Sequence, residues 1–82
     1  MLTAAQLRAA RNLLNWSQDQ LAKATGVSVP TIRRMESDAI GPGKSTHENV
    51  EAIRAALEKG GIDFIPEDGG GAGLRLRKKA KR

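Results

Sequence analysis

The sequence predicts an all-α domain, a compact bundle of four to five short helices followed by short β-like segments near the C-terminus. Three observations predict this fold. Thr3, Ser17 and Ser45 each stand three residues before a glutamine or glutamate, a pattern that caps the first turn of a helix. Apolar residues follow these caps at spacings of three and four, as on one face of an α-helix. After Gly61 the apolar residues alternate with polar ones instead, which is typical of strands.

The first helix is expected to begin at the Thr3 cap and to run to about Leu14. Its apolar stripe consists of Leu7, Ala10 and Leu14. Trp16 follows the break in this helix, and a large aromatic side chain at that point favours packing on the core over stacking on a nucleic-acid base.

Two short helices joined by a tight turn are predicted within residues 17–36. Gly26 ends the first helix, in the left-handed conformation that glycine adopts without strain. Ser28 caps the second helix, and Pro30 lies in its first turn, where the missing N–H interrupts no intrahelical bond. Ile32 and Met35 give this second helix an inward edge. The residues left facing outward are Val29, Pro30, Thr31, Arg33 and Arg34.

The order of small, glycine and apolar residues in this segment is typical of a helix-turn-helix, since two steeply crossing helices need a small residue, here Ala22, at their contact. The segment resembles the Xre/Cro/phage-repressor family of DNA-binding domains over about residues 2–60. The residues that carry the resemblance are Gln18, Leu21-Ala22, Gly26-Val27, Ile32 and Met35-Glu36. The resemblance implies a lambda-repressor-like bundle that presents its second motif helix to the major groove. The sequence departs from the family at Thr25, where an aliphatic residue is usual.

The resemblance also implies which residues bind DNA. Gln18 matches a position that contacts a phosphate at a helix N-terminus. Arg34 matches a base-contacting position, and arginine can bind O6 and N7 of guanine together. Val29 and Pro30 can only touch thymine methyl groups or fill space, whereas Arg33 reaches a phosphate. The expected DNA-binding residues are Gln18, Ser28, Val29, Pro30, Thr31, Arg33, Arg34 and Lys44.

The remaining helical part of the chain is expected to support this motif. In relatives a glutamate at the position of Glu36 pairs with an arginine of the first helix, here Arg11, as a structural ion pair. Residues 37–44 form a loop by their Gly-Pro-Gly content. A last helix is predicted from the Ser45 cap to about Lys59.

Residues 62–65 and 74–77 predict two short strands. A lone hairpin is marginal in water, so its apolar face needs a partner, either the domain's own helices or a second subunit. Because phage-type repressors bind as dimers, we hypothesise that this segment dimerises by strand pairing. The predicted dimerisation residues are Ile62, Phe64, Leu74 and Leu76. The predicted organisation is a DNA-binding domain at 1–61, a dimerisation segment at 62–77 and a basic tail at 78–82.

The charge of the chain is concentrated in its C-terminal part. The 82 residues include 14 Lys or Arg and 9 Asp or Glu, for a formal net charge of +5. Residues 69–82 hold six of the basic residues and none of the acidic ones. The basic tail at 78–82 is expected to attract any nucleic-acid duplex without reading its sequence.

Composition argues against several other classes of protein. The chain has no cysteine, which excludes disulfides and thiolate metal sites. His47 is the single histidine, and we expect neither a metal nor a cofactor. Ser, His and Asp form no constellation in which one would activate another, which predicts that the protein is not an enzyme. No apolar run reaches membrane length, so no membrane partner is expected.

The predicted function is therefore a sequence-specific transcriptional regulator, a bacterial or phage repressor or autoregulator, whose homodimer binds a near-palindromic operator in double-stranded DNA. The alternatives are an antitoxin or antiactivator that binds a protein partner, and a non-specific architectural protein that binds through its tail. Arg33 and Arg34, with no acidic residue between Gly26 and Met35, favour DNA. We expect a cytoplasmic, nucleoid-associated protein.

Overall fold

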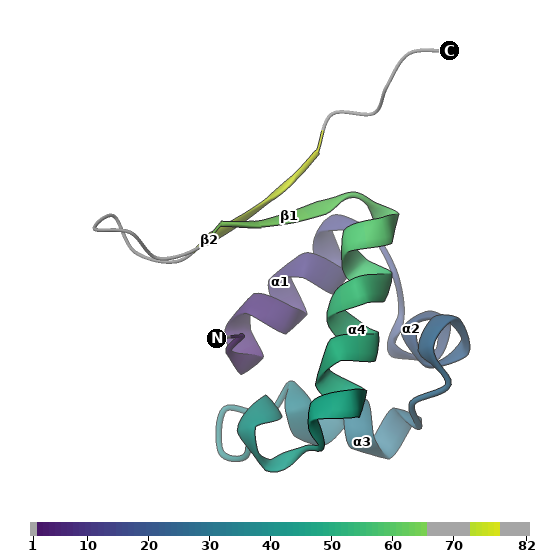
Figure 1. Cartoon of the computed structure of the whole chain (residues 1–82), viewed down its shortest axis with the longest axis vertical. Helices are drawn as coiled ribbons and strands as arrows, with labels where there is room; N and C mark the ends of the chain where they lie inside the picture. Colours follow the sequence, from purple (N-terminus) through teal and green to yellow (C-terminus); the bar gives the residue numbers. More distant parts are fainter. Residues whose placement is uncertain (1, 66–72, 78–82) are drawn as a thin grey trace.

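The computed structural model describes residues 2–65 and 73–77 (Figure 1). The predicted all-α bundle is confirmed, with a short antiparallel sheet after its last helix. The elements are α1 (Ala4–Leu13), α2 (Gln18–Thr25), α3 (Val29–Met35), the 3-10 helix η1 (Pro42–Lys44), α4 (His47–Gly60), β1 (Ile62–Ile65) and β2 (Gly73–Leu76). The predicted basic tail at 78–82 lies outside the described residues.

Side-chain caps define where the first helices begin. The Thr3 hydroxyl accepts from the amide of Gln6 at 3.1 Å, and the Gln6 side chain accepts from the amide of Thr3 at 2.9 Å. Ser17 and Gln20 form the same reciprocal pair at 3.0 and 2.7 Å. Both predicted capping boxes are therefore confirmed, and each satisfies two amides that the helix itself leaves unpaired.

The predicted cap of the last helix was wrong by one residue. Ser45 does not cap α4; its amide donates to the carbonyl of Pro42 at 3.0 Å and closes the turn of η1. The next hydroxyl along the chain, that of Thr46, accepts from the amide of Asn49 at 3.1 Å and caps α4 instead. Serine and threonine are similar caps, so the preceding turn decided between them.

The helices enclose one apolar core to which every α-helix and β1 contribute. Its fully or nearly fully buried members are Leu7, Ala10, Leu21, Val27, Ile32, Met35, Ile53, Leu57 and Ile62. Trp16 packs against this core, as predicted. Its ring lies so close to α4 that a Cβ at Gly60 would stand 2.9 Å from it. Glycine at that position therefore lets the tryptophan approach the helix.

The two strands pair with each other within one chain. β1 and β2 are antiparallel, with Ile62 opposite Leu76 and Phe64 opposite Leu74. β1 contacts α4 and β2 contacts α1, so the hairpin covers one end of the bundle (Figure 1). Ile62 is 0% exposed, and Phe64 and Leu74 pack against the same core, whereas Leu76 is 50% exposed. The domain's own helices are thus the partner of most of this apolar face.

Candidate nucleic-acid interface

The turn between α2 and α3 combines a left-handed glycine with a buried plug. Gly26 has a φ of 78°, and Val27 is buried against the core. Thr25, the departure from the family pattern, stabilises this turn through its hydroxyl, which donates to the carbonyl of Leu21 at 2.8 Å and accepts from the amide of Val27 at 3.1 Å.

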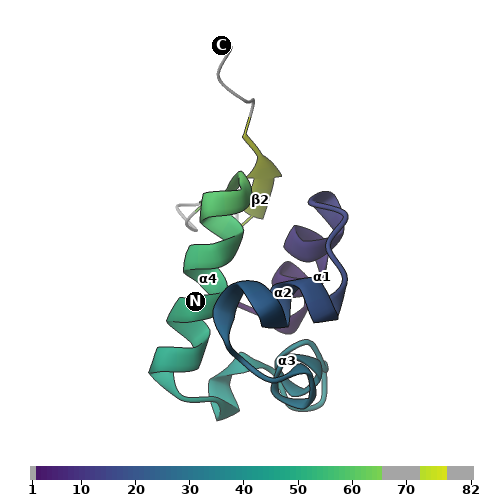
Figure 2. The ribbon, with the colours of Figure 1, turned by 90° about the vertical axis from the view of Figure 1, so that its right-hand side faces the viewer.

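Helix α3 has one buried edge and one outer face, as predicted. Ile32 and Met35 are 1% exposed and anchor the helix in the core. Pro30, Arg33 and Arg34 are exposed, and the predicted contact residues Val29 and Thr31 are half-buried. Figure 2 shows α3 at the end of the molecule opposite to β2, with α2 beside it.

Three residues on the outer face of α3 are hydrogen-bonded in a row. Ser28 caps the helix, its oxygen accepting from the amide of Thr31 at 3.3 Å. The Ser28 hydroxyl donates to the hydroxyl oxygen of Thr31 at 3.0 Å. The Arg34 guanidinium donates to the same Thr31 oxygen at 3.0 Å. The spacing of three places these residues along one face of the helix.

Glu36 links three helices at the inner end of α3. Its carboxylate accepts from Arg11 at 2.8 and 3.0 Å, so the implied structural ion pair is present. The same carboxylate also accepts a hydrogen bond from the side-chain amide of Gln18 at 3.0 Å. The backbone carbonyl of Glu36 accepts from Arg8 at 2.6 Å. These bonds tie α1 and the N-terminus of α2 to the C-terminus of α3.

The buried carboxylate of Glu36 is compensated by the positive charge of Arg11. The Glu36 side chain is 4% exposed and that of Arg11 is 15% exposed. The hydrogen bond that Arg11 donates to the Glu36 carboxylate raises the pKa of the Arg11 guanidinium above its ordinary value, against the opposing effect of burial. Arg11 is therefore charged whenever the domain is folded and neutralises the buried carboxylate.

Gln18 is more constrained than a surface glutamine. It is half-buried at the first position of α2, and one N–H of its amide is held by Glu36. A side-chain amide nitrogen carries two hydrogens, so a second N–H remains for an outside acceptor. This contact with Glu36 is 18 positions away in sequence, and nothing in the sequence pattern signalled it.

Lys44 lies at the end of η1, which contacts α3. It is exposed. The loop between α3 and η1 is held to α1 by Arg8, whose guanidinium pairs with the carboxylate of Asp38 at 3.1 Å. The lysine predicted to bind phosphate therefore lies on η1, next to α3.

Ion pairing separates the basic side chains into two groups. Within residues 2–65 and 73–77, the basic residues that pair with carboxylates are Arg8, Arg11, Arg54, Arg75 and Arg77. Arg33, Arg34 and Lys44 are exposed, as are Lys23 of α2 and Lys59 of α4, and in that part of the chain no carboxylate lies within salt-bridge distance of these five residues. Three of these five unpaired basic residues lie on α3 and η1, where a phosphate backbone can supply the counter-charge.

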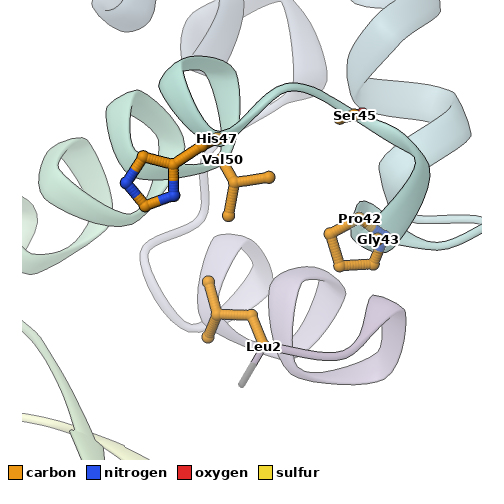
Figure 3. Close-up of a pocket in the computed structure, with 6 residues that line it drawn as sticks. All are labelled: Leu2, Pro42, Gly43, Ser45, His47 and Val50. Carbon is orange, nitrogen blue, oxygen red and sulfur yellow. The ribbon is translucent and has the colours of Figure 1, made fainter.

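An open hollow of about 260 Å³ lies between the N-terminal segment, η1 and the start of α4 (Figure 3). Its lining residues are Leu2, Pro42, Gly43, Ser45, His47 and Val50. The walls are mainly aliphatic, with Leu2 across from Val50.

Comparison with known families agrees with this geometry. A family model described as helix-turn-helix matches residues 7–58, which run from α1 through nearly all of α4. The chain belongs to this family of Xre/Cro/CI-like helix-turn-helix domains. Such domains bind DNA and regulate transcription, and they are typically not enzymes. A search of curated proteins found no match. Among the described residues, no helix is long and apolar enough to cross a membrane.

Proposed function

We propose that this helix-turn-helix protein is a sequence-specific repressor or autoregulator that reads an operator with α3. The observation that carries the proposal is the outer face of α3, where Arg33 and Arg34 are exposed without a carboxylate partner in the described chain. The major groove admits an α-helix, and its floor offers hydrogen-bond acceptors that differ between base pairs. Occupation of the operator then blocks access of polymerase.

Each outer residue has a chemistry that assigns its contact. Arg34 presents a fork of N–H donors that matches O6 and N7 of guanine. Arg33, next along the helix, is directed to a phosphate and adds affinity without sequence preference. Val29 and Pro30 have no polar side-chain atoms, so their contacts are with thymine methyl groups. The operator is therefore expected to contain a G at the Arg34 position.

Phosphate contacts flank the recognition helix on both sides. The free N–H of Gln18 lies at the N-terminus of α2, where the helix dipole also favours an anion. Lys44 lies on the other side, on η1. Two contacts of this kind set the orientation of α3 in the groove and add to the salt dependence of binding.

A second copy of the chain is the proposed partner for a near-palindromic operator. In the described chain, exposed apolar side chains remain on the hairpin at Ile65 and Leu76, which are 39% and 50% exposed. Figures 1 and 2 place the hairpin and α3 at opposite ends of the molecule. The two-fold axis of a hairpin dimer then has to be parallel to the direction from the hairpin to α3. With that axis, the α3 helices of both copies face the same duplex.

Sedimentation tests the dimer. Ile65→Asp is expected to give a monomer, because a charge on the paired surface opposes burial. Ile40→Asp is the matched control, since Ile40 is 43% exposed but lies in the loop before η1. Phe64→Asp is a poorer choice because Phe64 packs on the core. A dimer mass retained by Ile65→Asp and by Leu76→Asp would contradict the hairpin interface.

Selection of bound duplexes from a randomised pool tests sequence reading. Wild type is expected to recover a near-palindrome that contains G. Arg34→Ala is expected to lose the preference for that G, which corresponds to about 1–3 kcal/mol of binding free energy. Lys59→Ala is the control, because it removes one exposed charge at the hairpin end of α4. If no sequence is enriched and binding is lost as the salt concentration rises, the protein binds DNA only through electrostatic attraction to phosphates. Protein-partner capture would then test the antitoxin and antiactivator alternatives.

A further inference from the structure

We propose that Thr31 is a positioning residue for Arg34 and that it also acts as a hydrogen-bond donor to DNA. Together the two residues would make α3 select hydrogen-bond acceptors at two neighbouring base steps. The inference rests on the proposed function and names the base chemistry that the same surface takes. It follows from the row formed by Ser28, Thr31 and Arg34.

The Thr31 hydroxyl has its acceptor capacity filled from inside the protein. A hydroxyl carries one donor and two acceptor sites. The Ser28 hydroxyl occupies one acceptor site at 3.0 Å, and the Arg34 guanidinium occupies the other at 3.0 Å. The remaining capability of Thr31 is its own O–H. Toward DNA, Thr31 is therefore a donor only.

The same bond restrains Arg34. A free arginine side chain populates many rotamers, and ordering it on binding costs conformational entropy. The contact with Thr31 holds the guanidinium one turn back along the outer face of α3 before DNA arrives. A guanidinium has five N–H donors, so one bond to Thr31 leaves enough for a two-point contact with guanine. The Arg34 side chain is therefore already partly ordered before DNA binds, and it loses less conformational entropy on binding.

The spacing of the two residues sets what they read. Three residues of α-helix span about 4.5 Å, close to the roughly 3.4 Å between stacked bases. Arg34 and Thr31 therefore address adjacent steps. Both offer donors only, so acceptors are favoured: O6 and N7 of guanine, N7 of adenine and O4 of thymine. The exocyclic amine of cytosine is a donor and is disfavoured at both steps.

Thr31→Val and Thr31→Ser form the matched pair of variants that tests this assignment. Valine keeps the shape of threonine and removes the hydroxyl, whereas serine keeps the hydroxyl and removes a methyl group. Thermal unfolding of each variant reports whether α3 is intact. If Thr31→Val lowers the melting temperature, Thr31→Ala is used in its place, and its base preference is compared with that of Thr31→Ser.

Affinity is then measured for duplexes with each of the four bases at the Arg34 step and at its neighbour. Thr31→Val is expected to reduce the preference for G by about three- to tenfold and to remove the preference for acceptors at the neighbouring step. Thr31→Ser is expected to retain both, and non-specific affinity is expected to be unchanged. In an Arg34→Ala background, Thr31→Val is expected to have no further effect at the Arg34 step.

The possible results separate the inference from the proposed function. If wild type prefers G and Thr31→Val prefers it equally, the positioning role is overturned while sequence reading by Arg34 stands. If Thr31→Val and Thr31→Ser lose the preference alike, the hydroxyl is not responsible and the inference is again overturned. If wild type shows no base preference at all, the proposed function itself is overturned and the inference with it.

Discussion

The arginines of α1 and those of α3 use the same side chain in opposite ways. Arg8 and Arg11 each reach a carboxylate and also a backbone carbonyl, that of Glu36 for Arg8 and that of Trp16 for Arg11. Arg33 and Arg34 reach no carboxylate in the described chain. One pair therefore holds helices together, and the other presents positive charge outward.

The difference shows that the local sequence around an arginine does not decide its role. All four arginines lie on short helices that bury one edge, α1 of 10 residues and α3 of 7 residues. What separates them is whether folding brings an acidic side chain to them from a distant part of the chain. Glu36 lies 25 positions beyond Arg11, and Asp38 lies 30 positions beyond Arg8. Three predictions test this distinction.

The largest effect is expected at Arg11. Arg11→Met leaves the buried carboxylate of Glu36 without its counter-charge, and loss of one member of a buried pair costs about 3–5 kcal/mol. Chemical denaturation should show a domain that is largely unfolded, because small domains have little stability to spare. Arg11→Met with Glu36→Leu should recover most of the stability, since an apolar replacement of a buried pair is often neutral. Equal stability of wild type and Arg11→Met would contradict a structural role.

A smaller effect separates the two arginines of α3 from each other. Arg34→Lys keeps the charge but loses the two-point fork, and it should weaken preference for G by about 1–3 kcal/mol. Arg33→Lys should leave both preference and affinity nearly unchanged, because a phosphate accepts either cation. The measurement is the affinity for G-containing and substituted operators. A similar loss of preference in both variants would show that the two arginines are not divided between base and phosphate.

The smallest effect is expected at Arg8. Its pair with Asp38 is exposed, so Asp38→Ala, which removes this pair and leaves the bond from Arg8 to the Glu36 carbonyl in place, should lower the free energy of unfolding by about 0.5–1 kcal/mol. The same change frees the loop before η1, and affinity for any duplex should fall slightly through Lys44. Thermal unfolding and a salt titration of binding measure the two parts. A loss of stability as large as that of Arg11→Met would show that exposure does not distinguish the two pairs.

Local chemistry was sufficient to predict the helices and the turn of this protein. Thr3, Ser17 and Ser28 stand where hydroxyl caps satisfy free amides, and Gly26 stands where only glycine turns without strain. The apolar spacing then set which edge of each helix is buried, so Ile32 and its neighbours could be placed in the core. These signals act over three or four residues and are readable in the printed order.

Apart from the ion pair of Arg11 and Glu36, which the family resemblance implied, the contacts between distant segments were decided by the tertiary structure. Three features depend on how whole elements pack. They are the hydrogen bond from Gln18 to Glu36, the close contact of the Trp16 ring with Gly60, and the capping of α4 by Thr46. The same is true of the hairpin, whose apolar face could be matched by its own helices or by a second copy. Alternation of residues defines a face, but only packing supplies the surface that covers it.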